Sequence, residues 1–354
     1  MKEVINMQDK TELMTKTILV AYSFGKNKKI GYSGIDRYSE LVDKGLTSIG
    51  YKHGVYAYSD SKSPIPFTST ILRFFTTPKA VKEYNIIHLT QPHGYEAFLR
   101  SKARKILTWH DNMIFTRKSK VQFYNTYRGL MAYKLADIIT FNSKQSYTEL
   151  QEFIPKYTKF DENKTYDITP LPLESIWIKQ KISNKQERKG FIYIGAIHYE
   201  HKNFDGLIKT YKEICNNISS VQKPPLHIFT SSPNADELEE QVGSYPYPIF
   251  FHTRASDKEI LEYLKESIAL LHLSKYEGYG LPIMESLAVG TPVITLKEAK
   301  IPEETAKWSI RTDDVVSEAV KLYEKPRSAS QEAISYAKSL TKENYAKKMV
   351  KLYD

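Results

Sequence analysis

The 354-residue chain is poor in cysteine and in long apolar runs, and each shortage excludes a class of protein. Its single cysteine, Cys215, excludes internal disulfides and cysteine-based metal sites, which is typical of proteins in a reducing cytosol. No run approaches the roughly 20 apolar residues that a transmembrane helix needs, and the polar N-terminus does not resemble a signal peptide. These patterns predict a cytoplasmic protein.

Motifs that hold metal ions are also missing. The nine histidines show no spacing typical of a zinc site, and the chain contains no Asp-x-Asp motif. We therefore expect no metal ion and no other cofactor.

The length of the chain fits two domains of roughly 150 to 180 residues better than a single core. Apolar segments of strand length alternate with helical patterns, which predicts an α/β protein with parallel, doubly wound sheets. The expected strands are residues 18–22, 86–89, 105–109, 138–141 and about 168–173, then 191–194, 226–229, 249–251, 268–273 and 292–295.

A polar, charged segment at residues 182–189 is the expected linker between the two domains. The resulting division is a flexible leader (1–15), an N-terminal domain (16–181), a C-terminal domain (190–329) and a final helix (330–354). We expect this final helix to pack back toward the N-terminal domain.

The most informative segment follows the apolar run 268–273. A turn containing Gly278 and Gly280 precedes a short helix that Pro282 opens and Gly290 closes, the usual asymmetry of helix ends. No Ser, Thr, Asp or Asn stands immediately before Pro282, so the N–H groups of the first turn have no obvious side-chain cap. Uncapped donors at the positive end of a helix dipole predict a site for a diphosphate.

Two carboxylates bracket this site, Glu277 in the turn and Glu285 in what we expect to be the first helical turn. A glycosidase also uses two carboxyl groups, about 5 to 9 Å apart across a sugar. Eight residues of helix separate two side chains by about 12 Å, although a residue in the turn can lie closer. Their position beside a helix N-terminus favours contacts with hydroxyl groups of a nucleotide sugar instead.

The segment Glu-Gly-Tyr-Gly-Leu-Pro-Ile-Met-Glu, residues 277–285, resembles the Glu-x7-Glu signature of retaining GT-B glycosyltransferases. These enzymes form glycosyltransferase family four, also called glycosyltransferase group 1, which is related to glycogen synthase and to bacterial lipid mannosyltransferases. The resemblance implies two Rossmann-like domains with a cleft between them, the first for the acceptor and the second for the nucleotide sugar. It also implies that Glu277 lies by the transferred sugar and Glu285 holds the ribose. The donor would also contact the intervening backbone at Gly278, Tyr279, Gly280 and Leu281.

Further segments extend the resemblance from about Thr17 to the end of the chain. They imply catalytic roles for His110 and Lys202 beside Glu277, and donor contacts at Gly31, Gly34 and Gly195. The segments are Gly31–Ile35 with Arg37-Tyr38, Trp109-His110-Asp111, Ala136-Asp137 with Asn142-Ser143, Gly195 with His201-Lys202-Asn203, and Ile301-Pro302-Glu303.

Each of these residues also has a plainer interpretation. Lys202 could be a solvated lysine, and His110 could be a structural histidine at the end of a buried strand. The glycines Gly31 and Gly34 could simply form a tight turn. Asp111 could contact the acceptor or merely cap a helix.

Two departures from the family pattern weaken part of the donor site. Many members carry an arginine directly after the glycine that corresponds to Gly195, where it pairs with the donor diphosphate; this chain has Ala196. The segment before the linker usually ends in Asn-Gly, and here it reads Leu171-Pro172-Leu173. Some branches of the family lack the arginine, so the diphosphate site is weakened rather than removed.

The positive charge is confined to the N-terminal half. Residues 1–172 hold 26 Lys/Arg against 16 Asp/Glu, a net +10, whereas residues 173–354 hold 25 of each. Nine basic residues and one acid, Asp111, fall within residues 100–134. The candidates for contact with the acceptor or with an anionic membrane are therefore Arg117, Lys118 and Lys120. In the second case the protein would be peripheral and would bind the inner face of the membrane. A solvated helix face is the alternative, and no recognised module accompanies the patch to indicate nucleic acid.

Together these features predict a retaining, metal-independent glycosyltransferase. It would move a hexose-type sugar from a UDP- or GDP-sugar to a glycan, glycolipid or lipid-linked acceptor, in surface polysaccharide or glycoconjugate synthesis. A nucleotide-sugar epimerase or hydrolase of the same fold, and a non-catalytic partner subunit, are the alternatives.

Overall fold

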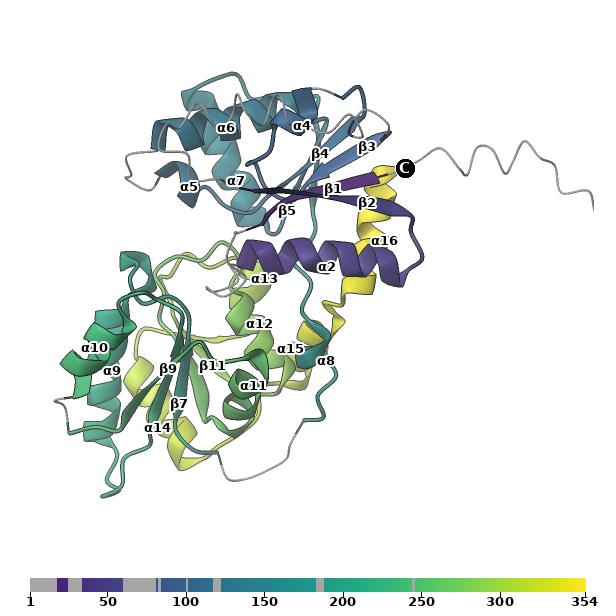
Figure 1. Cartoon of the computed structure of the whole chain (residues 1–354). Coiled ribbons are helices and arrows are strands. Elements are labelled where there is room, and N and C mark those ends of the chain that lie inside the picture. The colour runs from purple at the N-terminus through teal and green to yellow at the C-terminus, as the bar shows by residue number, and fades with distance from the viewer. Residues whose placement is uncertain are drawn as a thin grey trace, which may run out of the picture. The chain divides into compact units, whose positions relative to one another are not determined.

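The structure of the chain is a computed structural model (Figure 1). It describes residues 18–24, 34–59, 81, 84–99, 101–116, 122–182, 188–243 and 246–354. Among the helices of these residues, none combines the length and the apolar character needed to cross a bilayer.

The chain forms two compact units. The first contains Met1–Pro170 together with Lys342–Asp354, and the second contains Leu171–Thr341. Each unit has a six-stranded sheet in which every described pair of neighbouring strands is parallel, with helices on both faces. The two doubly wound α/β sheets predicted from the sequence are therefore confirmed.

The strands of the first sheet follow the spatial order β2-β1-β3-β4-β5-β6. Its central strands are mostly apolar, as expected for strands covered on both faces, and all four residues of β3 and of β5 are buried. The strands are β1 (Ile18–Phe24), β2 (His53–Ser59), β3 (Ile86–Leu89), β4 (Arg104–Trp109), β5 (Ile138–Phe141) and β6 (Thr165–Ile168).

Helices cover both faces of this sheet. Because the chain moves from β1 outward to β2 and then back to β3, α2 lies on the face opposite to α4 and α6 (Figure 1). Aromatic side chains fill the space under α6, where Trp109 stacks on Phe115 with ring centroids 5.0 Å apart. The helices are α2 (Gly34–Ser48), α4 (Glu96–Leu99), α5 (Met113–Thr116), α6 (Gln122–Leu135), α7 (Lys144–Phe153) with the 3-10 turn η2 (Ile154–Lys156), and α16 (Lys342–Tyr353).

The C-terminal segment is two helices and not the single helix expected over residues 330–354. The helix α15 (Gln331–Ser339) ends at Leu340, whose carbonyl accepts a hydrogen bond from Leu173 N–H (2.7 Å) instead of continuing the helical ladder. The second helix, α16, belongs to the first unit and packs on α2 beside Gly45. There Tyr345 hydrogen-bonds to Tyr38, with both rings buried.

The second sheet has the order β12-β11-β10-β7-β8-β9. Its strands are β7 (Phe191–Ile194), β8 (Leu226–Thr230), β9 (Ile249–Thr253), β10 (Ala269–His272), β11 (Val293–Leu296) and β12 (Ile310–Thr312). Its helices are α8 (Ser175–Ile178), η3 (Glu200–Lys202), α9 (Phe204–Asn217), α10 (Ala235–Gly243), α11 (Asp257–Glu266), α12 (Leu281–Ala288), α13 (Glu303–Ala306), α14 (Val315–Glu324) and α15. The helices α9 and α14 pack together, while α8, α12 and α15 form a second group (Figure 1).

The second unit begins earlier than the linker expected at residues 182–189. Leu171 and Leu173 are buried, and Trp177 of α8 is fully enclosed where α8 meets α11, α12 and α15. This apolar segment is therefore part of the second core, which is why the division between the units falls at Pro170–Leu171.

A buried histidine makes the first unit sensitive to acid. His88 Nδ1 lies 2.9 Å from Tyr353 Oη and Nε2 lies 2.8 Å from Thr108 Oγ1, so the ring links α16 to the sheet. Burial, with a smaller contribution from His110, lowers the pKa of His88 from 6.5 to about 3. Below pH 6.5 His88 is protonated in the unfolded chain, whereas in the folded chain it stays neutral down to about pH 3. The stability of the fold therefore decreases as the pH falls from 6.5 to about 3.

We expect His88→Gln to be less stable than the wild type near pH 7.5, because the substitution removes these contacts. The difference in unfolding free energy should shrink by roughly 1 kcal/mol near pH 5.5, since only the wild type carries the proton penalty of His88. Urea unfolding of both proteins at the two pH values measures the difference. A gap that stays constant would show that His88 does not titrate as described.

Candidate active site

The residues expected to bind the donor gather where the second sheet reverses its strand order. The chain builds outward from β7 through β8 to β9 and then returns to place β10 on the other side of β7. In such sheets ligands bind outside the carboxyl ends of the two strands at the reversal. Gly195 follows β7 and Lys202 ends η3 shortly after it, while Glu277 lies in the loop after β10.

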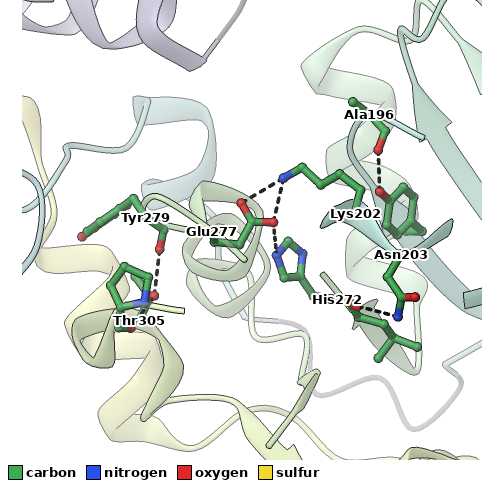
Figure 2. Close-up of polar contacts among 10 residues, drawn as sticks. Ala196, Lys202, Asn203, His272, Glu277, Tyr279 and Thr305 are labelled. Carbon is green, nitrogen blue, oxygen red and sulfur yellow. Dashed lines mark hydrogen bonds and ion pairs between the residues drawn. The ribbon is translucent and has the colours of Figure 1, made fainter. Parts of the chain in front are cut away.

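An ion pair with a histidine beside it occupies this edge of the sheet (Figure 2). Lys202 Nζ donates to both carboxylate oxygens of Glu277, at 2.7 Å to Oε1 and 2.9 Å to Oε2. His272, the last residue of β10, places Nε2 2.9 Å from the same Oε1. Glu277 is only 8 % exposed, so its charge needs compensation inside the protein, and these two neighbours contribute to it.

The electrostatics favour a permanently ionised carboxylate. Burial by itself raises the pKa of Glu277, but the charges and hydrogen bonds of Lys202 and His272 outweigh burial and hold the pKa well below its ordinary range. Tyr193, in β7, feels the same negative charge: burial first, and then Glu277, raise the pKa of its phenol. Glu277 therefore accepts hydrogen bonds at neutral pH and is not a proton donor.

Backbone hydrogen bonds tie the two loops of the site together. Lys275 N–H donates to the His201 carbonyl (2.8 Å), and Asn203 Nδ2 donates to the Leu273 carbonyl (3.0 Å). Glu277 N–H donates to the Lys300 carbonyl (2.9 Å), which fixes the loop on its other side. Asn203 has a left-handed backbone (φ 55°), a conformation that asparagine tolerates better than most residues. These contacts fix the backbone from which Lys202 and Glu277 project.

The helix α12 begins with its N-terminus uncapped, as its sequence predicts. Gly280 is the N-cap residue with φ 90°, a conformation that suits glycine, and it offers no side chain to the first turn. Pro282 has no N–H group. Among the described residues, the N–H groups of Gly280 and Leu281 have no hydrogen-bond partner. They remain available at the positive end of the helix dipole.

Other parts of the Glu-x7-Glu segment are also placed by α12. Glu285 is buried and lies in the second turn of the helix, not in the first as expected, because the helix begins at Leu281. Tyr279 is buried too, and its carbonyl accepts a hydrogen bond from Thr305 Oγ1 (2.8 Å; Figure 2). Gly195 has φ 155°, and a Cβ there would lie 3.1 Å from Tyr193 Oη, so this turn also requires glycine.

His110 and Asp111 belong to the first unit. His110 follows β4, and its Nε2 donates to the Thr90 carbonyl (2.8 Å) at the end of the neighbouring β3. Burial lowers the pKa of His110 to about 4, with the Thr90 bond opposing this shift, so the ring is neutral at pH 7. Asp111 Oδ1 accepts from Met113 N–H (2.8 Å), so the helix-capping alternative for Asp111 is observed at the start of α5.

Several expected residues lie outside the described part of the chain: Gly31, Arg117, Lys118 and Lys120. Gly34 is the first residue of α2. Of the basic residues of 100–134 that the structure describes, Arg104 opens β4 and Lys134 lies in the last turn of α6, both at the amino edge of the sheet.

Two contributors to the site were missed in the sequence. His272 interrupts the apolar run 268–273 at the end of a strand, and this position was the signal that could have identified it. Tyr193 occupies an inward position of β7 and donates to the Ala196 carbonyl (2.8 Å). Nothing in its sequence context distinguishes Tyr193 from an ordinary core aromatic.

Comparison with protein families decides the nature of this unit. Residues 175–339 match the family model described as Glycosyl transferases group 1. This range fills almost all of the second unit, Leu171–Thr341. The second unit is similar to the group 1 glycosyl transferases over nearly its whole length. The chain is a glycosyltransferase, as predicted from its Glu-x7-Glu segment.

Solved structures extend the similarity in fold to the whole chain. The chain is similar to a sucrose-phosphate synthase from Thermosynechococcus elongatus (14 % identity, 96 % of this chain and 98 % of that one, TM-score 0.69). It is also similar to a trehalose-6-phosphate protein from E. coli bound with UDP-2-fluoro glucose (8 % identity, 96 % of this chain and 99 % of that one, TM-score 0.68). A third similar structure is WaaG, a glycosyltransferase involved in lipopolysaccharide biosynthesis (12 % identity, 94 % of this chain and 95 % of that one, TM-score 0.62). No curated protein sequence matches the chain. The predicted GT-B fold is confirmed.

The start of α12 can be tested with a pair of glycines. A Cβ at Gly280 would lie 3.0 Å from Ile283 Cδ1, at φ 90°, whereas Gly50 has φ 73° with nothing within 4 Å. We expect Gly280→Ala and Gly50→Ala each to cost about 1–2 kcal/mol of stability through the left-handed backbone. Only Gly280→Ala should also weaken binding of UDP or GDP, measured by titration calorimetry. Equal nucleotide affinity in the two variants would contradict a role for the α12 N-terminus.

Proposed function

We propose that the chain is a retaining, metal-independent glycosyltransferase that uses a UDP- or GDP-sugar. The observation that carries this proposal is the buried Lys202–Glu277 pair between the ends of β7 and β10, close in sequence to the uncapped start of α12. A cation and backbone N–H groups suit a diphosphate, and an ionised carboxylate suits sugar hydroxyl groups. Glu285, buried in α12, would hold the ribose.

In this proposal the charge that develops on the departing diphosphate is met without a metal ion. Lys202 and the N–H groups at Gly280 and Leu281 would stabilise it, which is electrostatic catalysis by groups fixed in advance. The arginine that many members place after the glycine is Ala196 here, so Lys202 carries more of this task. The chain also lacks an Asp-x-Asp motif to hold a divalent cation.

The chemistry we propose is attack on the same face of the sugar that the nucleotide leaves. The departing phosphate would accept the proton of the acceptor hydroxyl, which needs no separate protein base. Glu277 cannot protonate a leaving group, because its pKa lies well below the ordinary range. His110 would accept a hydrogen bond from the transferred sugar through Nδ1, since Nε2 carries a hydrogen toward Thr90 and the ring is neutral.

The donor and the acceptor classes rest on chemistry and on related folds. Two similar structures, the E. coli trehalose-6-phosphate protein and the S. aureus TarM complex, contain UDP or a UDP-sugar, which favours a hexose carried on UDP. WaaG is involved in lipopolysaccharide biosynthesis, which favours a glycan, glycolipid or lipid-linked acceptor in surface polysaccharide or glycoconjugate synthesis.

We further propose that the protein works in the cytoplasm at an anionic membrane surface. The side chain of Phe123, in α6, is 78 % exposed, Tyr127 one turn later is 40 % exposed, and residues 117–120 immediately before α6 contain three basic residues. Exposed aromatic rings beside basic residues are typical of interfacial binding. Sedimentation with anionic vesicles but not with neutral vesicles tests the proposal; equal partition onto both, or onto neither, contradicts it.

Product analysis tests the function as a whole. The protein is incubated in EDTA with UDP-glucose, UDP-N-acetylglucosamine and GDP-mannose, each with glycan and lipid-linked acceptors. We expect transfer with the anomeric configuration retained, at a rate within about twofold of the rate without EDTA. Epimerised or merely hydrolysed donor would indicate the two enzymatic alternatives, and nucleotide binding without turnover would indicate a partner subunit. Loss of activity in EDTA with rescue by Mn²⁺ or Mg²⁺ would exclude the metal-free mechanism.

The donor site is tested by removing single charges. Lys202→Ala and Glu285→Ala should each weaken UDP or GDP binding by roughly 1–3 kcal/mol, as loss of a hydrogen bond to a charged group does. Lys321→Ala and Glu318→Ala are matched controls, because these residues form an exposed ion pair on α14 in the same unit. Unchanged nucleotide affinity in both folded site variants would contradict the assignment.

A further inference from the structure

Lys202 and Glu277 neutralise each other's charge. Lys202 gives both of its described hydrogen bonds to Glu277, one to each carboxylate oxygen. The side chains of Lys202 and Glu277 are only 19 % and 9 % exposed, so bulk water screens the pair weakly. The ammonium that a donor diphosphate needs is therefore already engaged by the carboxylate that a sugar needs.

A donor that binds both groups must draw Lys202 away from Glu277. The two loops that carry Lys202 and Glu277 are joined by the hydrogen bonds of Lys275 to His201 and of Asn203 to Leu273. The lysine side chain, and not the main chain, must therefore move. Four flexible methylene groups allow an ammonium to reach a second anion without movement of the main chain. The partial exposure of Lys202 leaves a path to an incoming ligand.

His272 is the group that remains when Lys202 turns away. It lies in β10, is 1 % exposed, and places Nε2 2.9 Å from Glu277 Oε1. Among the described residues neither ring nitrogen makes a hydrogen bond of good geometry, and the 2.9 Å approach of Nε2 to Oε1 is the close polar contact that the ring makes with Glu277. The ring therefore acts on the site through Nε2 alone. A buried carboxylate that loses one cation keeps more of its orientation and its compensation when a second polar group stays in contact with it.

We propose that Lys202 passes from Glu277 to the diphosphate of the donor and that His272 is the positioning residue that holds Glu277 during this exchange. This inference rests on the proposed function, because it needs a nucleotide sugar at this site. Its consequence is that Glu277 opposes binding of a nucleoside diphosphate alone and favours the nucleotide that carries a sugar. Lys202 leaves Glu277 when either a nucleoside diphosphate or a nucleotide sugar binds. Only the nucleotide sugar then offers hydroxyl groups that donate hydrogen bonds to Glu277 in place of Lys202.

The first experiment measures UDP and GDP affinity by titration calorimetry in Glu277→Gln. Because Lys202 is no longer held by a carboxylate, we expect the affinity for the nucleoside diphosphate to rise about tenfold, while the affinity for UDP-glucose or GDP-mannose does not rise. Glu277→Asp, which keeps the charge on a shorter side chain, should fall between Gln and the wild type. Glu318→Gln is the matched control and should stay within about twofold. Unchanged or weaker binding of UDP and GDP in Glu277→Gln would overturn the exchange.

The second experiment separates a positioning role of His272 from a structural role. The amide nitrogen of glutamine reaches the position of Nε2, whereas that of asparagine reaches only the position of Nδ1. His272→Asn should lower the ratio of nucleotide-sugar affinity to nucleotide affinity about tenfold, and His272→Gln should restore most of it at a similar melting temperature. His53→Gln, which alters a histidine–carboxylate pair in the first unit, is the control. A parallel loss in both His272 variants, or in neither, would overturn the positioning role.

Lys202→Ala distinguishes failure of this inference from failure of the proposed function. If Lys202→Ala leaves UDP and GDP affinity unchanged, the donor site itself is wrongly placed and the exchange is excluded with it. If Lys202→Ala weakens binding but Glu277→Gln does not strengthen it, the donor site stands and the exchange alone is wrong.

Discussion

The buried ion pair between Lys202 and Glu277 constrains the second unit more than any other single interaction at the site. Charges placed out of water are costly unless they are paired and hydrogen-bonded, so the loops after β7 and β10 must meet with correct geometry. The parallel sheet makes this meeting possible, because it brings the carboxyl ends of β7 and β10 to the same edge. The bonds of Asn203 and Lys275 then set the distance between the loops.

The same edge gathers the groups that, in the proposed function, stabilise the negative charge of a diphosphate. The helix α12 contributes a positive end whose first N–H groups lack protein partners among the described residues, and Lys202 contributes a mobile full charge. Ala196 removes one cation that many relatives place here. In the proposed function the chain relies on fewer cations than those relatives, and on one, Lys202, that is paired with Glu277.

The first unit depends on the end of the chain for its core. Tyr345 and Tyr353 of α16 are fully buried against Tyr38 and His88, and burial raises the pKa of both phenols well above the ordinary value. Because α16 belongs to this unit while α15 belongs to the other, the contacts of the first unit join residues 38 and 88 to residues 345 and 353, far apart in the sequence. Covering His88 in this way also creates the acid-sensitive contact of the first unit.

The sequence determined the features that depend on neighbours along the chain. Apolar runs such as 86–89 and 138–141 identified the buried strands, and Gly280 with Pro282 identified the start of α12. The edge strands β2 and β12 were missed, because an edge strand is covered on fewer sides and needs no continuous apolar run.

Tertiary structure decided what depends on residues far apart in sequence. The break at Leu340 depends on Leu173, and the role of His272 depends on Glu277 and Lys202, which come from two different loops. The sequence by itself therefore predicted the glycosyltransferase resemblance and the GT-B fold, and the roles of its two glutamates stay predictions. The pairing of Glu277 with Lys202 followed only from the order of the strands, since contacts across a parallel sheet leave no periodic pattern along the chain.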